Sequence, residues 1–225
     1  LPLVTIDGNA SITGSVFGGG ELGLTKGSVF VNIKGGTIAE DVYGGGSLAN
    51  TNTTSSVGQT DSDGVAITDG DGNIVTETVH PTTTVNLLGG TIRNAYGGGL
   101  GQKSGVNNAT RDVEAIVYGN VRLNLNGLES ADYVATDHSS SVYDASDETD
   151  GTYYLANDGC VVTGSVFGCN NIYGTPKGHT KVHVFKTKAK TGQAADGYDV
   201  AAVYGGGNQA DYVPDESESE QSTEV

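Results

Sequence analysis

Short stretches in which apolar residues occupy every second position recur along the chain, at 28–34, 84–88, 120–126 and 180–185, with a shorter one at 3–7. Alternation of this kind places one row of side chains on each face of an extended segment. The pattern therefore predicts β-strands that bury Val, Ile and Leu on one face and present polar residues, mostly Asn and Lys, on the other.

A second pattern follows these strands. A small apolar residue, an aromatic residue and a glycine-rich triplet occur together five times, at 16–20, 42–46, 95–99, 166–170 and 203–207. Units of this size cannot bury an apolar face alone, so their repetition predicts stacking. Phe17 and Tyr43 lie 26 residues apart, a length that suits one turn of a parallel β-helix.

These patterns predict an all-β fold, a right-handed parallel β-helix (β-solenoid) of about five coils with long loop or hairpin insertions. The right hand is expected because crossovers between parallel strands are almost always right-handed. A β-sandwich with glycine-rich hairpins is the alternative. The glycine corners recur at the same place relative to the aromatic residue, which favours the solenoid.

The spacing of the repeats also predicts the domain organisation. A single solenoid domain is expected over 1–213, with insertions at about 47–81, 100–115 and 128–159, and an acidic disordered tail or linker over 214–225. The first and last coils have no obvious polar caps, which exposed solenoid ends usually need. We therefore expect either crude caps or further coils and neighbouring domains in a longer polypeptide.

Charge limits the kinds of partner. The formal net charge is −16, and only 11 Lys and Arg residues are spread over the chain. Nucleic-acid binding needs clustered cations to neutralise phosphates, so it is not expected. An anionic membrane surface is disfavoured for the same reason. No apolar stretch has the length of a membrane span, so no membrane insertion is expected within this chain.

Two motifs carry a family resemblance. The Gly-Gly-Thr-Ile corner at 35–38 and 89–92, joined to Val-Tyr-Gly-Gly-Gly at 42–46, resembles repeats of glycine-rich β-helical adhesin-like proteins on the surface of gut Bacteroidetes. The likeness to autotransporter passenger domains is looser. The resemblance covers the coils, not the insertions or the tail. It implies an exported, extracellular protein at the bacterial cell surface, and it carries over no catalytic residues.

The first insertion contains a candidate calcium site. Two strand-like runs, 65–68 and 74–79, flank an Asp-Gly-rich turn and predict a β-hairpin. Oxygen-bearing side chains gather around its tip, and calcium takes six to eight oxygen ligands. They are Asp61, Asp63, Asp69, Asp71 and Asn73. Asp-Gly pairs are also ordinary turn formers, so the protein is expected to need no cofactor, with calcium as the one candidate.

The third insertion contains candidate ligand-binding residues. Four tyrosines lie among acidic residues there, and insertions of solenoids often project from the binding face. They are Tyr133, Tyr143, Tyr153 and Tyr154. We expect them to contact a glycan or a protein of a host or cell surface, if this segment recognises a partner.

Three further features allow two interpretations each. The five aromatic residues stack either outward, as a strip for sugar rings, or as a purely structural ladder. Cys160 and Cys169 either form a local disulfide or remain inert thiols in the wall. His179, Lys181 and His183 alternate with the inward Val182 and Val184, so an exposed polar stripe is favoured over a metal site.

Function divides into two classes. An adhesin-like binding or stalk segment without catalytic activity is the main interpretation. A carbohydrate-active β-helix, similar to a polysaccharide lyase or glycoside hydrolase with its site on the insertions, is the alternative. Such an enzyme needs paired or clustered carboxylates. The regular strands offer no repeated acidic pair, and none of the arginines has an obvious carboxylate cluster beside it.

Overall fold

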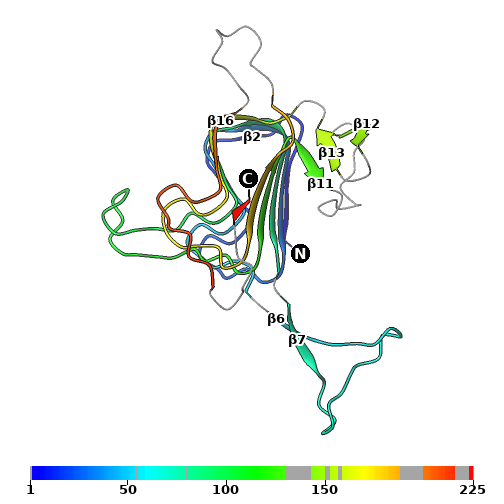
Figure 1. Ribbon diagram of the computed structural model, residues 1–225. Helices are drawn as coiled ribbons and strands as arrows, with labels where there is room; N and C mark the ends of the chain where they lie inside the picture. The colour runs from blue at the N-terminus through cyan, green and yellow to red at the C-terminus, as the bar shows by residue number, and fades with distance from the viewer. Residues whose placement is uncertain are drawn as a thin grey trace.

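The computed structural model describes residues 2–53, 55–79, 81–129, 143–149, 153–156, 159–187, 200–215 and 223–224. These residues form strands and turns and no helix. One twelve-stranded sheet bends round to form the walls of a solenoid, and all its pairings are parallel (Figure 1). The prediction of an all-β solenoid is thereby confirmed.

The first wall contains the alternating strands of the sequence. They are β1 (Leu3–Ile6), β4 (Val29–Ile38), β8 (Thr83–Ile92), β10 (Val121–Leu125) and β15 (Thr180–Val184), and a two-residue strand β17 (Thr223–Glu224) pairs with β15. Val4, Val31, Val85, Leu123 and Val182 take equivalent positions. Alternation thus builds a continuous row of apolar side chains along the main core.

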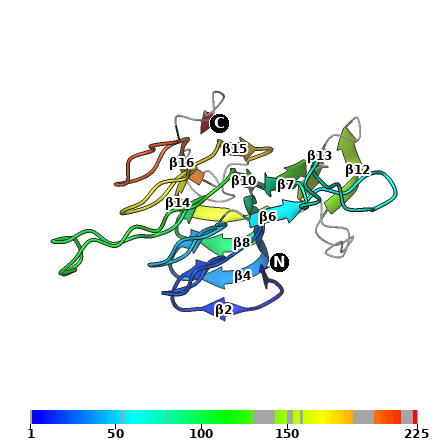
Figure 2. The same ribbon diagram turned by 90° about the horizontal axis from the view of Figure 1, so that it is seen from below.

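The chain turns at the glycine corners into two further walls. The second wall contains β2 (Ser11–Ile12), the ends of β4 and β8, and the start of β14 (Val161–Phe167). The third contains β3 (Val16–Phe17), β5 (Val42–Tyr43), β9 (Ala95–Tyr96), the end of β14, and β16 (Val200–Tyr204). Figure 2 shows these rungs stacked from β2 at one end to β16 at the other.

The five aromatic residues form one stacked ladder along the third wall. Ring centroids are 4.7 Å apart for Phe17 and Tyr43 and 4.9 Å apart for each later pair through Tyr96, Phe167 and Tyr204. The preceding Val or Ala lies in the main core, so the aromatic residues are on the outer face of the wall. Tyr43 and Tyr96 are nevertheless only 2% exposed. The ladder is a second core, which supports the structural interpretation for its inner rungs.

Close stacking explains the glycines that follow each aromatic residue. A methyl group added to Gly18, Gly44, Gly97 or Gly168 would overlap the carbonyl oxygen of the equivalent glycine in the next repeat. Neighbouring rungs therefore approach more closely at this corner than any Cβ atom permits. Glycine is required here for space, because these four residues do not have a positive φ.

Two small antiparallel sheets project from the solenoid. β6 (Ser55–Gly58) and β7 (Thr76–Val79) form the base of an arm that extends well beyond the walls (Figure 1). β11 (Gly127–Glu129), β13 (Tyr153–Ala156) and β12 (Tyr143–Thr149) form a three-stranded sheet. Leu88, Leu128 and Ala156 pack together where this sheet meets the first wall.

We predict that Gly44→Ala destabilises the solenoid strongly. The added methyl group would meet Gly97 and the side chains of Thr83 and Val85, and overpacking of this kind costs about 3 kcal/mol or more. Gly70→Ala is the matched control, because nothing lies within 4 Å of its added Cβ. Urea denaturation followed by circular dichroism measures both variants. Equal midpoints would show that the rungs do not stack this closely.

Candidate functional site

The segments that follow the five glycine phrases lie on one side of the solenoid. We call them the loop stack: residues 20–27, 46–53, 99–119, 170–178 and 207–213. Backbone hydrogen bonds join each segment to another, from Ser47 N–H to Gly20 O, Leu100 N–H to Gly46 O, Asn171 N–H to Gly99 O and Asn208 N–H to Asn170 O, at 3.0 to 3.1 Å. The loop stack therefore extends the register of the walls.

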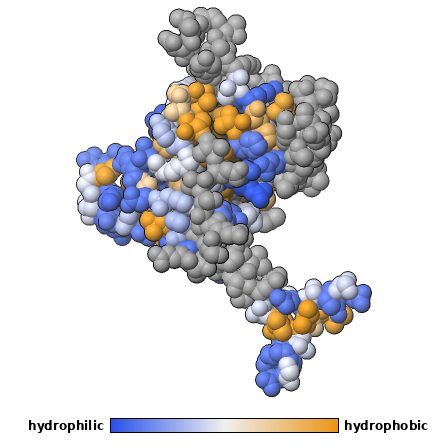
Figure 3. All heavy atoms as spheres, viewed as in Figure 1, coloured by the Kyte–Doolittle hydropathy of each residue, from blue (hydrophilic) through white to orange (hydrophobic). Residues whose placement is uncertain are grey.

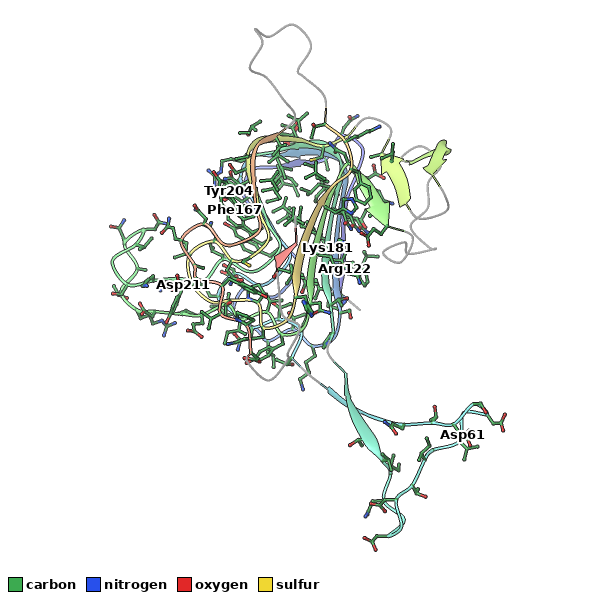
Figure 4. The ribbon with its side chains drawn as sticks, in the orientation of Figure 1. Asp61, Arg122, Phe167, Lys181, Tyr204 and Asp211 are labelled. Atoms are coloured by element: carbon green, nitrogen blue, oxygen red, sulfur yellow. The ribbon has the colours of Figure 1, made fainter. Side chains whose placement is uncertain are left out.

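A pocket of about 290 Å³ opens between the last three segments of the loop stack. Its polar lining includes Lys103 and Glu114 from the loop after β9, Tyr173 and Lys177 from the loop after β14, and Asp211 from the loop after β16. Ile172 and Val213 contribute apolar surface. Figure 4 shows Asp211 on this side of the molecule, away from the strand residues Arg122 and Lys181.

Charges in the pocket are arranged around Tyr173. The Lys103 ammonium group lies 5.3 Å from the centre of the Tyr173 ring, within the range of a cation–π contact. A hydrogen bond to the Glu114 carboxylate, with its negative charge, raises the pKa of the Tyr173 hydroxyl. Lys177 forms an ion pair with Asp215 at 3.3 Å. An aromatic ring flanked by a cation and carboxylates can bind a neutral ligand that is rich in hydroxyl groups.

A buried carboxylate, which the sequence did not reveal, connects the walls to the aromatic ladder. Asp41 is 4% exposed and accepts hydrogen bonds from Arg93 Nε at 2.8 Å and Arg93 Nη2 at 3.1 Å. Asn94 Nδ2 donates to it at 2.9 Å and the Tyr43 hydroxyl at 3.2 Å. Arg93 thus pairs with a single carboxylate, which the search for a carboxylate cluster beside the arginines did not find. Asp41 directly precedes β5, and Arg93 lies two residues before β9, so the signal was a pair of opposite charges just before the third-wall strands of adjacent repeats.

The hydroxyl of Tyr43 links this cluster to the loop stack. Asn171 Nδ2 donates to it at 2.7 Å, and Asn208 Nδ2 donates to Asn171 Oδ1 at 3.0 Å. Burial, and to a smaller extent the negative charge of Asp41, raise the pKa of Tyr43 despite the Asn171 bond. Burial likewise raises the pKa of Tyr96 to about 12. These groups stay neutral and fix the loops, so their role is structural.

A shallow groove of about 510 Å³ runs along the outer edge of the ladder near its C-terminal end. Asn94, Tyr96, Ser165, Phe167 and Tyr204 line it, together with Gly207 and Asn208. Tyr204 is 49% exposed, whereas the inner tyrosines are buried. The last rung is therefore the one place where a ladder tyrosine offers much of its surface to a ligand or partner.

The predicted calcium residues lie in two separate turns of the arm. The Thr68–Ile74 pairing confirms the predicted hairpin, and a second turn at 61–64 joins it. Asp61 Oδ1 accepts hydrogen bonds from the N–H groups of Asp63 and Val65, and Asp69 Oδ1 from those of Asp71 and Asn73. The bonds from Asn73 and Asp71 lower the pKa of Asp69. Figure 4 shows Asp61 in one of the two lobes of the arm, away from the walls.

Within the described residues, no three His, Cys, Asp or Glu side chains lie together as a metal site would require. Asp61 and Asp69 each bind the backbone of their own turn, which is the geometry of a polar turn cap. Calcium binding by the arm stays a prediction.

Three of the four predicted ligand-binding tyrosines belong to the small antiparallel sheet of β11, β13 and β12. Tyr133 lies outside the described residues. Tyr143 is the first residue of β12, and Tyr153 and Tyr154 are the first two of β13. The antiparallel pairing of β12 with β13 brings Tyr143 opposite Ala156, so these tyrosines do share one small sheet.

The outer face of the first wall is polar, as predicted, but much of it is enclosed. Asn32, Asn86 and Asn124 form a buried amide ladder with bonds of 2.7 and 2.9 Å. Lys181 and His183 lie outward beside it and contact the Glu129 carboxylate at 2.9 and 3.0 Å. Lys181 and His183 are thus half-exposed and paired with an acid from β11.

The two cysteines are free thiols. Both are buried, and Cys160 belongs to the main core. Burial raises the pKa of the Cys169 thiol to about 11, which outweighs a hydrogen bond with Thr180. The structure therefore favours inert thiols over a local disulfide.

Comparison with known proteins gives no relative. No protein-family model, no curated protein and no solved structure matches the chain. Among the described residues, none belongs to a helix that is long and apolar enough to cross a membrane.

We predict that Glu129 makes the protein sensitive to acid. Burial alone raises the pKa of this carboxyl, but hydrogen bonds and charges from Lys181 and His183 outweigh burial and leave the pKa below its ordinary value. The stabilisation is complete above the ordinary pKa and is lost as the pH falls through the lowered one. Between about pH 5 and pH 3, the unfolding free energy should fall more steeply for the native chain than for Glu129→Gln. Parallel pH profiles would contradict this.

Proposed function

We propose that the chain is a non-catalytic, adhesin-like binding or stalk segment of an exported bacterial surface protein. The observation that carries this proposal is the register of the solenoid. The same rung-to-rung spacing runs through three walls, the aromatic ladder and the loop stack. A rigid rod that displays stacked loops and a projecting arm suits a protein that presents a binding surface at a distance. The family resemblance of the Gly-Gly-Thr-Ile corners supports the bacterial and extracellular parts of the proposal.

The five repeats are proposed to be five coils of a right-handed β-helix. Five aligned aromatic residues support the number. The strong preference of parallel crossovers for the right hand supports the handedness.

The pocket of the loop stack is the proposed binding site, and its proposed ligand is the end of a glycan. Tyr173 offers an aromatic ring, and Lys103, Glu114, Gln209 and Asp211 offer donors and acceptors for hydroxyl groups. At about 290 Å³ the pocket is at the small end of ligand sites, which suits one or two sugar residues. A net charge of −16 favours a neutral glycan over a nucleic acid or an anionic membrane.

One observation favours the enzymatic alternative. Glu114 and Asp211 line the same pocket, and glycoside hydrolysis uses two carboxyl groups on either side of the scissile bond. Hydrolysis or elimination of a glycan by the native chain, lost in both Glu114→Gln and Asp211→Asn, would support this class instead.

We predict that the chain binds one class of neutral glycan on a glycan array and that Tyr173→Ala reduces this binding at least tenfold. The reason is that the ring forms one side of the pocket and holds Lys103 and Glu114. Tyr204→Ala is the matched control, since this exposed tyrosine lies outside the pocket and should leave binding unchanged.

The array is read with calcium and again with a chelator. Loss of binding with the chelator would show that binding needs calcium. It would support a calcium site in the Asp-rich turns of the arm, whose carboxylates are the candidate ligands. No binding in either condition would contradict the glycan proposal and leave the stalk or a protein-binding role. Binding that survives Tyr173→Ala would place the site elsewhere.

A further inference from the structure

The arm that leaves the solenoid between β5 and β8 contains an eight-residue repeat of its own. The two copies read Thr-Asp-Ser-Asp-Gly-Val-Ala-Ile at 60–67 and Thr-Asp-Gly-Asp-Gly-Asn-Ile-Val at 68–75. Each copy forms one lobe of the arm. In each lobe the first aspartate accepts hydrogen bonds from the N–H groups two and four residues later, at 2.9 to 3.0 Å. The arm therefore presents the same acidic turn twice.

Three backbone hydrogen bonds join the two lobes to the base of the arm. Ile67 N–H donates to Gln59 O at 2.9 Å, Val75 N–H to Ile67 O at 2.9 Å, and Gln59 N–H to Val75 O at 2.8 Å. These residues follow one another at intervals of eight, so the ring of bonds results from the repeat. Because the ring fixes both lobes, a partner that binds the arm meets a surface that is already formed.

Aliphatic side chains are exposed around this junction. Val65 is 61% exposed, Ile67 40% and Ile74 57%. Figure 3 shows apolar residues gathered in the middle of the arm, between hydrophilic tips. Exposed apolar residues that lie together inside a polar rim are typical of an interaction surface. We call these three residues the arm patch.

The exposure of the arm patch does not depend on the terminal rungs of the solenoid. The arm leaves the stack between β5 and β8, and each of these strands is paired on both sides, β5 with β3 and β9 and β8 with β4 and β10. It projects sideways from the walls (Figure 1). A further rung at either end of the stack would therefore leave the arm patch uncovered.

Charge around the arm patch determines the kind of partner. Between Lys34 and Arg93 the sequence contains no Lys or Arg residue. A second copy of the chain would bring the same acidic turns and a further charge of −16, so like charges would oppose that contact. An anionic membrane is opposed for the same reason. The exposed acids of the two turns are Asp61, Asp63, Asp69 and Asp71.

Side-chain chemistry separates the arm from a glycan site. Between Tyr43 and Tyr96 the sequence has no Phe, Trp or Tyr residue, so the arm offers no ring on which a sugar can stack. Val and Ile side chains instead suit the aliphatic side chains of another protein. The arm thus combines an aliphatic centre with an acidic rim.

We infer, independently of the proposed glycan pocket, that the arm docks a protein partner whose contact surface carries Lys or Arg side chains around an apolar centre. The apolar centre of the partner covers Ile67 and Ile74. Its cations face the carboxylates of Asp63 and Asp71, one in each lobe. The complementary charges orient the partner, and the aliphatic contacts hold it. The arm and the pocket belong to different insertions, so either site can fail without the other.

Two synthetic peptides of equal length and charge probe this chemistry. One alternates lysine with valine, and the other alternates lysine with serine. Titration calorimetry of the 225-residue chain is carried out with a chelator present, so that calcium does not contribute. The Lys–Val peptide should bind about tenfold or more tightly than the Lys–Ser peptide. Its affinity should fall when the salt rises from about 0.05 M to about 0.5 M, because salt screens the charge contacts.

Two double variants of the arm separate the apolar and the charged parts of the contact. Ile67→Thr with Ile74→Thr keeps β-branched residues on the arm and should weaken binding of the Lys–Val peptide about tenfold or more. Asp63→Asn with Asp71→Asn should remove much of the salt dependence. All four side chains are exposed, so the circular dichroism spectrum and the melting temperature should stay unchanged.

Matched controls make the same chemical changes away from the arm. Leu22→Thr with Leu24→Thr removes two leucines of the loop stack that are 69% and 53% exposed. Asp7→Asn with Glu21→Gln removes two exposed charges from the first repeat. Both controls should bind the Lys–Val peptide like the native chain.

Four outcomes would overturn the inference. Neither peptide binds, or both bind equally, which would mean that net charge alone attracts them. The arm variants and the controls bind alike, which would place the contact elsewhere. In sedimentation velocity the native chain self-associates and the double threonine variant of Ile67 and Ile74 does not, which would make a second copy the occupant. Glycan binding by the pocket should be the same in the arm variants, so its presence or absence decides the proposed function separately.

Discussion

The structure depends on how closely successive rungs stack at the glycine corners. Ring centroids 4.7 to 4.9 Å apart match the distance between hydrogen-bonded strands, so the aromatic ladder and the sheet share one repeat. This spacing is possible at the corners only without a Cβ atom, as the contacts of Gly18, Gly44 and Gly97 show. When successive rungs stack at this spacing, the apolar rows of the walls, the aromatic ladder and the loop stack all lie in register.

Polar groups join the rungs where apolar contacts cannot. Burial of the Asp41 carboxylate would be costly alone, but bonds from Arg93, Asn94 and Tyr43 compensate for the lost water. Two of these partners belong to the following repeat, so the charge pair connects one rung to the next. The amide ladder of Asn32, Asn86 and Asn124 does the same on the first wall. Polar bonds therefore connect successive rungs both beside the aromatic ladder and on the first wall. These walls support the loop stack and its pocket.

Regular features could be predicted from the sequence, and features that arise between repeats could not. Alternation predicted the strands of the first wall and their buried rows, and the Asp-Gly turn predicted the hairpin of the arm. The burial of Tyr43 and Tyr96 could not be predicted from the sequence, because it depends on loops that cover the outer face of the wall. The Asp41–Arg93 pair was missed because its members are 52 residues apart and meet only through the rung register. The pocket combines three loops of different lengths, so no single motif marks it.

The direction of the backbone hydrogen bonds has a mechanical consequence. Bonds between parallel rungs point along the stack, so a pull on the two ends of the chain opens them one after another, beginning at the terminal rungs. Each opened rung would release the chain up to the next aromatic residue: 26 residues from Phe17 to Tyr43, but 71 from Tyr96 to Phe167. At about 3.4 Å per extended residue, these lengths are roughly 90 and 240 Å. The insertions would then add to the chain length that an opened rung releases. Under load the protein would extend in steps of unequal length instead of unfolding in a single event.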